Sequence, residues 1–236
     1  MNLLGQTVGV GAPELKKIIR ADGRAEWVYQ AKEGPSLVGV AKALQPANAI
    51  TGSPEAANNL FSLYSVAKRA ESVGLDKLNY KDLTQAQLDK AMAEIKATPG
   101  LEAIFKTAHA EYEKFNRNMV QFGVDTGVFS KDMAAKMLKN GDYVPYYREN
   151  NDGSVSLMMG QERIQNMGNV KEQPYLHELV GGDQRIADFM TSSVRNANMI
   201  LDMGLRNQAT KSVANELQKI GLAQIIEGKT RAGTNI

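Results

Sequence analysis

Segments that combine a helix-start signal with evenly spaced apolar residues follow one another between residues 53 and 139. Ser53 stands before Pro54 and Glu55, which favours a helix start because a hydroxyl caps free amides, proline fits the first turn and a carboxylate suits the helix dipole. Apolar residues then recur at three- and four-residue steps up to Gly74, which is typical of a helix end. The sequence therefore predicts a long amphipathic helix here.

Two further helices are predicted downstream. Thr84 and Gln87 form a capping box that opens the first of them, which ends near Pro99. The second runs from about Leu101 to Phe122. Their apolar positions are Leu88, Ala91, Met92, Ile95, Ile104, Phe105, Ala108, Tyr112, Phe115, Met119 and Phe122. Because short connections favour antiparallel neighbours, we expect these helices to pack as an antiparallel core.

The sequence pattern changes after this core. Ser130 caps a short helix that Asn140 and Gly141 end. Pro145 then excludes a helix, because it lacks an amide hydrogen and pushes the preceding residue toward extended geometry. A turn and a brief strand follow, and with the tyrosine-rich stretch they indicate a small irregular or hairpin insertion over residues 142–182.

A long helix closes the predicted domain. Asp183 is the expected cap, and apolar residues recur at helical spacing to about Ile220. The polar tail spans residues 223–236. The fold class that follows is mostly α, an antiparallel helical bundle with a small irregular or hairpin insertion and a long C-terminal helix, in a domain of residues 53–222.

The first 52 residues are short apolar fragments broken by glycine and proline. Only the run from Pro13 to about Lys32 looks periodic. Its candidate buried residues are Leu15, Ile18, Ile19, Trp27 and Val28. We therefore expect residues 1–52 to form an irregular N-terminal extension with one short helix.

Composition and incomplete motifs exclude several kinds of catalytic, cofactor and metal site. The chain has 236 residues with no cysteine and two histidines, so thiolate nucleophiles and cysteine-rich zinc sites are excluded. A dinucleotide loop at Gly9 would need a glycine where Glu14 stands. His109 and Glu113 share a helix face, but an ordinary helix pair explains them. We predict no catalytic, cofactor-binding or metal-ligating residue, no small-molecule substrate and no membrane span.

Two groups of residues are candidates for partner binding. One is Tyr143, Tyr146, Tyr147 and Arg148, where flat rings with hydroxyls suit docking against helices or against a partner. The other is Met190, Met199 and Met203 on the closing helix, because methionine adapts to irregular surfaces. Core filling is the default role for these methionines, and a partner surface is the alternative.

The closing helix also offers a weak nucleic-acid face. Its basic residues are Arg185, Arg195, Arg206 and Lys211. Arginines interleaved with amides suit phosphate contacts, although the same pattern fits the solvated side of an amphipathic helix. The net charge of +2 is too small to indicate nucleic-acid binding, and the aspartates of this helix reduce the positive charge of the face.

One motif carries a family resemblance. The turn Asp125-Thr126-Gly127, the capped helix from Ser130 and the stretch from Tyr143 to Arg148 resemble a helical segment of the large polyvalent proteins of bacteriophages and conjugative elements. Residues 64–70 are similar to the first long helix of that segment, and residues 196–217 to its closing helix. The resemblance covers roughly residues 54–220.

The resemblance implies a viral protein in a virion interior or host cytoplasm. The expected function is a non-enzymatic structural or assembly segment of an internal virion or DNA-ejection protein. Its partners would be copies of itself or another virion protein. The alternative is a DNA-associated accessory domain of a mobile-element polyvalent protein.

Overall fold

The computed structural model describes residues 3–75, 83–139, 148–149, 155–156 and 188–222, and its described part is mostly helical. The elements, in chain order, are α1 (Leu3–Gly9), β1 (Pro13–Ile19), β2 (Ala25–Ala31), α2 (Leu37–Thr51), α3 (Pro54–Val73), α5 (Gln85–Ala97), α6 (Leu101–Asp125), α7 (Lys131–Lys139), β3 (Arg148–Glu149), β4 (Val155–Ser156) and α8 (Phe189–Lys219). The predicted fold class is confirmed: a helical core, a small antiparallel strand pair and a long C-terminal helix.

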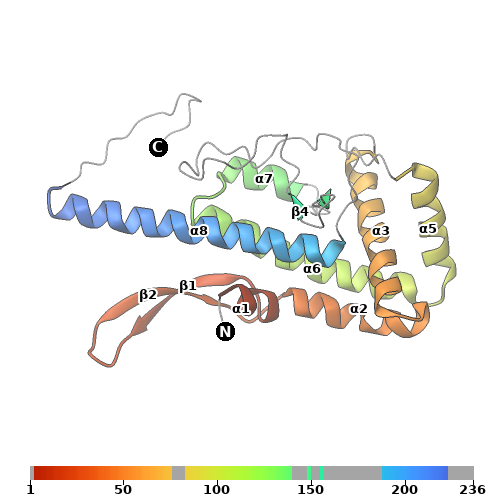
Figure 1. The fold of residues 1–236 in the computed structure, drawn as a ribbon, viewed down its shortest axis with the longest axis horizontal. Helices are drawn as coiled ribbons and strands as arrows, with labels where there is room; N and C mark the ends of the chain where they lie inside the picture. Colours follow the sequence, from red (N-terminus) through yellow and green to blue (C-terminus); the bar gives the residue numbers. More distant parts are fainter. Residues whose placement is uncertain (1–2, 76–82, 140–147, 150–154, 157–187, 223–236) are drawn as a thin grey trace.

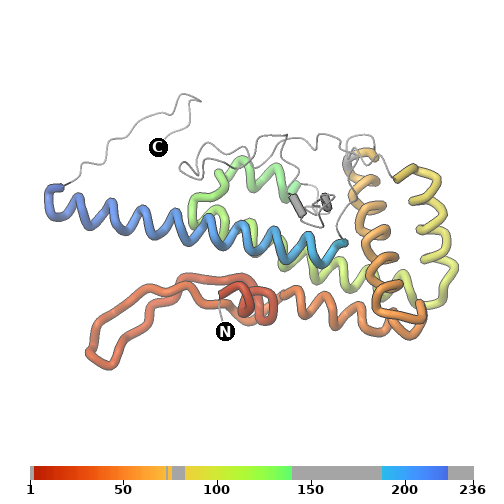
Figure 2. The backbone as a smooth tube through the Cα atoms, in the orientation of Figure 1, coloured from red at the N-terminus to blue at the C-terminus, as the bar shows by residue number. Residues whose placement is uncertain are grey.

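The helices lie in two directions. The long helix α6 runs through the body beside α2 and the first half of α8, while α3 and α5 stand across one end as an antiparallel pair (Figure 1). The backbone trace follows the same path, with α6 and α8 running in the same direction (Figure 2). The core fills the space between α2, α3, α6 and the first half of α8.

The predicted helix boundaries follow from their caps. Ser53 Oγ accepts a hydrogen bond of 3.0 Å from the amide of Ala56, and Gly74 caps the other end of α3. Thr84 and Gln87 make both hydrogen bonds of the capping box at α5. Ser130 Oγ accepts from the amide of Met133 at the start of α7. Local polar side chains thus decide where these helices begin.

The prediction for residues 1–52 is wrong in its elements. Residues 13–32 form the hairpin of β1 and β2 in place of a helix, with Leu15 paired to Tyr29 and Lys17 to Trp27. The turn contains Gly23 at φ 80°, a conformation that favours glycine. Antiparallel pairing places directly opposed residues on one face of the sheet, so Leu15, Trp27 and Tyr29 share a face.

Helix α2 was not expected, and it belongs to the core. Ser36 caps it, and the buried residues Leu37, Val40, Leu44 and Ala47 face the body. Helix α2 packs along α6, and Gly39 faces the flexible end of the Glu111 side chain, whose Oε1 would lie 2.9 Å from a Cβ atom added there. Pro46 lies inside the helix but is exposed. Proline has no amide hydrogen, so one carbonyl of the preceding turn lacks its helical donor, and water can bond to it instead. Residues 37–51 are therefore part of the domain.

Helix α8 begins at Phe189 rather than after Asp183, which lies outside the described residues. Asp188 Oδ1 accepts hydrogen bonds of 3.0 Å from the amides of Met190 and Thr191. Asn58 of α3 donates to the same oxygen at 3.3 Å. Ser62 Oγ, one helical turn along α3, accepts from the amide of Phe189. Two side chains of α3 therefore help to fix the N-terminus of α8.

Candidate assembly surface

Two arms extend from the body on the same side, the β1–β2 hairpin and the second half of α8 (Figure 1). All buried residues of α8 lie between Phe189 and Gly204. From Leu205 onward no residue of the described helix is buried. At 1.5 Å per residue, α8 is about 46 Å long, so its second half reaches past the core.

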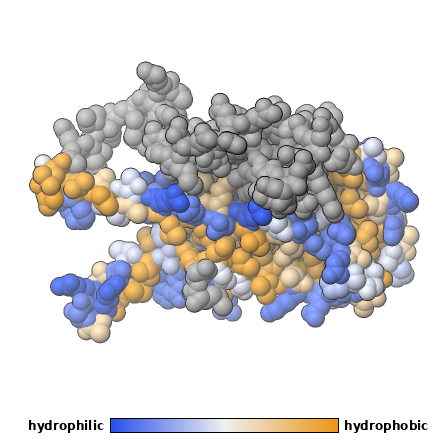
Figure 3. All heavy atoms as spheres, in the orientation of Figure 1, coloured by the Kyte–Doolittle hydropathy of each residue, from blue (hydrophilic) through white to orange (hydrophobic). Residues whose placement is uncertain are grey.

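The hairpin is anchored at its base and exposed toward its tip. The ring of Tyr29 meets Phe122 of α6 edge-on, with centroids 5.3 Å apart. On the same face of the sheet, Trp27 is 61% exposed and Ile19 is 74% exposed. Figure 3 shows hydrophobic surface on this arm next to the hydrophilic tip. The hairpin thus presents apolar side chains beyond the point where α6 covers them.

Charged residues around the hairpin largely pair with one another. Lys32 Nζ lies 3.0 Å from a Glu14 carboxylate oxygen, and Arg20 is paired with Glu26. Arg20 holds the pKa of the Glu26 carboxyl below its usual value through their hydrogen bond. Lys16 and Lys17 are exposed outside these pairs, so residues 13–32 carry five basic and three acidic side chains, a net charge of +2 that is small for an arm binding nucleic acid by charge alone.

The second half of α8 carries a stripe of apolar residues. Val213 is 60% exposed and Ile220 is 65% exposed. The stripe consists of Leu205, Ala209, Val213, Leu217 and Ile220, and we call it the distal stripe. At 100° per residue these positions span about 120° of the helix circumference, roughly opposite the residues buried in the first half. The helix thus has a second apolar face that the described body does not cover.

The predicted partner residues lie elsewhere or inside. Tyr143, Tyr146 and Tyr147 lie outside the described residues, and Arg148 is described only as backbone in β3. Met203 is buried, while Met190 and Met199 are half-buried against the core. The methionines of α8 therefore fill the core, because they fall on its body-facing half, and the exposed apolar surface is on the distal stripe.

The predicted nucleic-acid residues do not form one face. Arg195 and Arg206 are exposed on the same side of α8. Lys211 points the other way: its Nζ would lie 2.9 Å from a Cβ atom added at Gly127. Asp202 pairs with Arg206 at 3.0 Å, and Arg185 lies outside the described residues.

A buried aromatic cluster surrounds His109. The rings of Phe61 and Phe105 meet edge-on at 5.5 Å, and His109 lies 5.9 Å from the Tyr64 ring. Its Nδ1 is 3.5 Å from Oε1 of Glu113, a pair that is ionic only when the imidazole is protonated. Among the described residues no group of three or more histidine, aspartate or glutamate side chains is placed to hold a metal. The predicted ordinary helix pair fits this packing.

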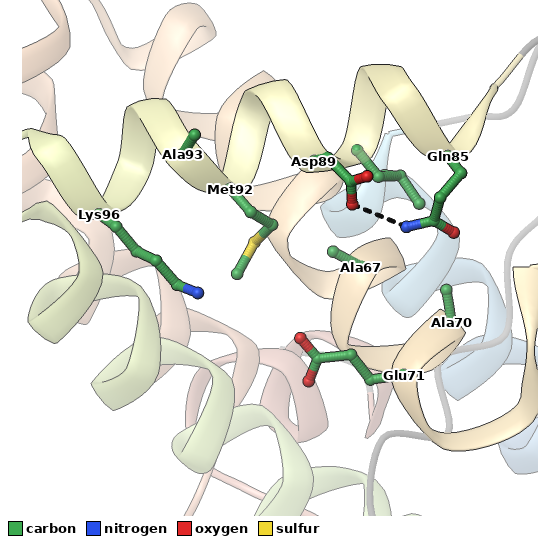
Figure 4. Close-up of a pocket in the computed structure, with 9 residues that line it drawn as sticks. Ala67, Ala70, Glu71, Gln85, Asp89, Met92, Ala93 and Lys96 are labelled. Carbon is green, nitrogen blue, oxygen red and sulfur yellow. Dashed lines mark hydrogen bonds between the residues drawn. The ribbon is translucent and has the colours of Figure 1, made fainter.

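A groove of about 420 Å³ lies between α3 and α5 (Figure 4). Glu71 and Lys96 extend into it from opposite helices, over the side chain of Met92. Gln85 donates a hydrogen bond of 2.8 Å to Asp89 along one wall. The charged side chains of this groove are all exposed, so water competes for them and the groove does not define a ligand.

Comparison with known proteins finds no match: no family model, no curated protein and no solved structure is similar to this chain. None of the described helices is both long and apolar enough to span a bilayer.

Proposed function

We propose that this chain is a non-enzymatic structural segment that assembles with copies of itself, within an internal virion or DNA-ejection protein of a bacteriophage. The observation that supports assembly is the exposure of large apolar side chains on two arms that extend from one side of the body. Removing apolar surface from water is favourable, and contiguous exposed patches mark interaction sites. The arms supply such surface without unfolding the core.

The virion part of the proposal is supported by the resemblance to phage polyvalent proteins. Its motif includes the turn from Asp125 to Gly127 and the Ser130 cap, which lie beside α8 and at the start of α7. The corresponding compartment is the virion interior or the host cytoplasm. Another virion protein is the second possible partner for the same arms.

Sedimentation velocity over a wide concentration range tests assembly. We expect discrete oligomers whose fraction rises with concentration and that dissociate on dilution. A chain that stays monomeric at the highest concentration, with or without other virion components, would contradict the proposal.

Serine substitutions on the arms sharpen this test. Trp27→Ser with Ile19→Ser removes apolar surface from the hairpin, and Val213→Ser with Ile220→Ser removes it from α8. Ile50→Ser is the matched control, because Ile50 is an exposed apolar residue of α2 that lies on neither arm. We expect weaker assembly from at least one arm variant and unchanged assembly from the control. Equal behaviour of all variants would place the interface elsewhere.

A DNA-associated accessory domain remains the second candidate. Arg195 and Arg206 lie on one side of α8, about 16 Å apart along the axis, so the two side chains could contact separate phosphates of one duplex. Duplex DNA added to the sedimentation experiment separates the candidates. A monomer that shifts only with DNA, in a salt-dependent way that Arg195→Glu with Arg206→Glu abolishes, would favour this function over assembly.

Mass spectrometry of purified particles tests the virion assignment separately. We expect peptides of this chain in particles released by cells that encode it. Oligomers in solution without any trace in particles would retain assembly and remove the virion role.

A further inference from the structure

The distal stripe of α8 contains two opposite charges as well as apolar residues. Arg206 and Glu216 fall within the same 120° sector as Val213, at opposite ends of the stripe. Both side chains are more than half exposed. An apolar stripe with a positive charge near one end and a negative charge near the other is complementary to a reversed copy of itself.

The spacing defines one register for such a pair. If two copies of α8 lie antiparallel and centred on Lys211, Arg206 of each is level with Glu216 of the other. In the same register Ala209 is level with Val213, and Leu205 with Leu217. Positions 206, 209, 213, 216 and 220 follow the three- and four-residue steps of a coiled-coil seam. Two apolar and two charged positions of this seam are therefore matched in each copy, whereas Ile220 is level with Asp202 and lies outside the matched part of the seam.

The alternative register of two parallel copies is electrostatically unfavourable. It would bring Arg206 against Arg206 and Glu216 against Glu216, and like charges at close range repel. Lys211, the centre of the antiparallel register, adds no repulsion, because it faces Gly127 on the side away from the stripe. The charge pattern thus selects orientation as well as partner.

Neighbouring charges extend the match. Within one chain Asp202 pairs with Arg206 at 3.0 Å, and Lys219 pairs with Glu216 at 2.6 Å. In the antiparallel register these two pairs lie side by side, so the charges alternate in sign from Asp202 to Arg206 to the second copy's Glu216 and Lys219. Neither intrachain pair has to break for the two helices to meet.

We propose that the distal stripe binds the same stripe of a second copy of this chain, antiparallel and centred on Lys211, with Arg206 level with Glu216. This inference rests on the proposed assembly function and names its partner and geometry. The matched seam from Leu205 to Leu217 is about 18 Å long, which is short for a coiled coil, so the dimer dissociates readily on dilution.

Charge reversal in the full-length chain tests the register. Arg206→Glu alone and Glu216→Arg alone each place like charges together, and we expect each to raise the dimer dissociation constant about tenfold or more. The double variant Arg206→Glu with Glu216→Arg restores opposite charges and recovers dimerisation. Lys211→Glu is the control, with the same change of charge off the stripe and no expected loss. Circular dichroism of each variant verifies that α8 is intact.

Cross-linking gives a second readout that does not depend on charge. Because the chain has no cysteine, Ala209→Cys and Val213→Cys each introduce the sole thiol, at two level positions close to the middle of the seam. Oxidising a mixture of the two variants, one carrying a size tag, should yield a mixed disulfide dimer. Each variant alone should yield less, since the two copies of position 209, or of position 213, lie about 6 Å apart along the axis and a disulfide requires Cβ atoms about 3.5–4.5 Å apart.

The outcomes separate this inference from the proposed function. A wild-type chain that never self-associates removes both. A wild-type chain that self-associates normally, while single charge reversals have no effect or each cysteine variant cross-links with itself alone, overturns the antiparallel register and leaves assembly through another surface.

Discussion

Gly204 of α8 lies directly against Phe122 of α6: a Cβ atom added to the glycine would be 2.7 Å from Cε1 of the ring. The same atom would be 2.8 Å from Oγ1 of Thr126, which is itself buried. Contacts this short do not occur between real side chains, so glycine is what allows α6 and α8 to approach here. Gly204 is also the last buried residue of α8, so the contact marks where the body ends and the arm begins.

We therefore expect Gly204→Val to destabilise the protein. The branched side chain must displace Phe122 or separate the helices, and overpacking of this kind costs about 1–3 kcal/mol. Urea denaturation followed by circular dichroism measures the loss. Gly9→Ala is the control, because nothing lies within 4 Å of a Cβ atom added there. A Gly204→Val chain as stable as the wild type would show that the two helices do not pack closely.

The helices from α3 to α7 were predictable because their ends are set by neighbouring residues. The hydroxyl of Ser53, the box of Thr84 with Gln87 and the hydroxyl of Ser130 act within three residues of themselves, so their effect can be read directly along the chain. Each places the first turn of a helix. The core residues then follow from spacing.

The hairpin was missed because Leu15 and Ile18 also fit a helical spacing. The competing signal was Asp22-Gly23 between runs rich in β-branched and aromatic residues, which favours a tight turn between strands. Helix α2 was missed because Gly39 and Pro46 suggested loops. The place of α2 in the core comes from its packing along α6, a tertiary contact that sequence spacing does not contain.

The candidate site was only partly predictable for a related reason. Amphipathic spacing identifies the apolar residues of α8 but not where the covering body stops. Met203 and Val213 both lie on apolar faces of one helix, yet only Met203 is buried. The difference depends on the length of α6 and on its contact with Gly204, which only the assembled fold defines.

Tyr29 should titrate at unusually high pH. Burial raises the pKa of its hydroxyl above the usual range, and the negative charge of Asp125 adds to the rise. The pKa of Tyr29 in the folded chain exceeds the unfolded value of about 10. The contribution of this group to the free energy of unfolding is therefore complete below about pH 10 and is lost as the pH rises through the folded pKa. Subtracting the ultraviolet titration of Tyr29→Phe from that of the wild type isolates this group.

Removing the charge at position 125 provides the check on that titration. Asp125→Asn should lower the pKa of Tyr29 toward its ordinary value while burial still holds it above. A Tyr29 titration that is ordinary in the wild type would contradict the docking of the hairpin against α6.

Asp188 should make the stability of the domain depend on pH in the acid range. Burial raises the pKa of this carboxyl, but hydrogen bonds from Thr191, Asn58 and Met190 outweigh that effect and hold the pKa below its ordinary value. Its contribution is therefore present above the unfolded pKa of about 3.9 and is lost as the pH falls through the folded value.

Two substitutions distinguish the charge of Asp188 from its capping role. Asp188→Ala should cost about 0.5–2 kcal/mol at pH 7, because the amides of Met190 and Thr191 lose their acceptor. Asp188→Asn keeps an acceptor but does not titrate, so its stability should fall less between pH 5 and pH 3 than that of the wild type. Urea denaturation at each pH measures both, and equal pH profiles for wild type and Asp188→Asn would refute the assignment.

Trp27 provides a direct optical probe of the hairpin, because it is the sole tryptophan of the chain and is 61% exposed. In dilute solution its fluorescence should resemble that of a solvated indole and should be strongly quenched by iodide. When the chain is concentrated until sedimentation shows oligomers, burial of the ring would move the emission to shorter wavelength and protect it from iodide. Emission that stays unchanged while oligomers form would restrict the interface to α8 and remove the hairpin from it. Protection in the dilute monomer would mean that the described body already covers the ring, which contradicts the exposed arm itself.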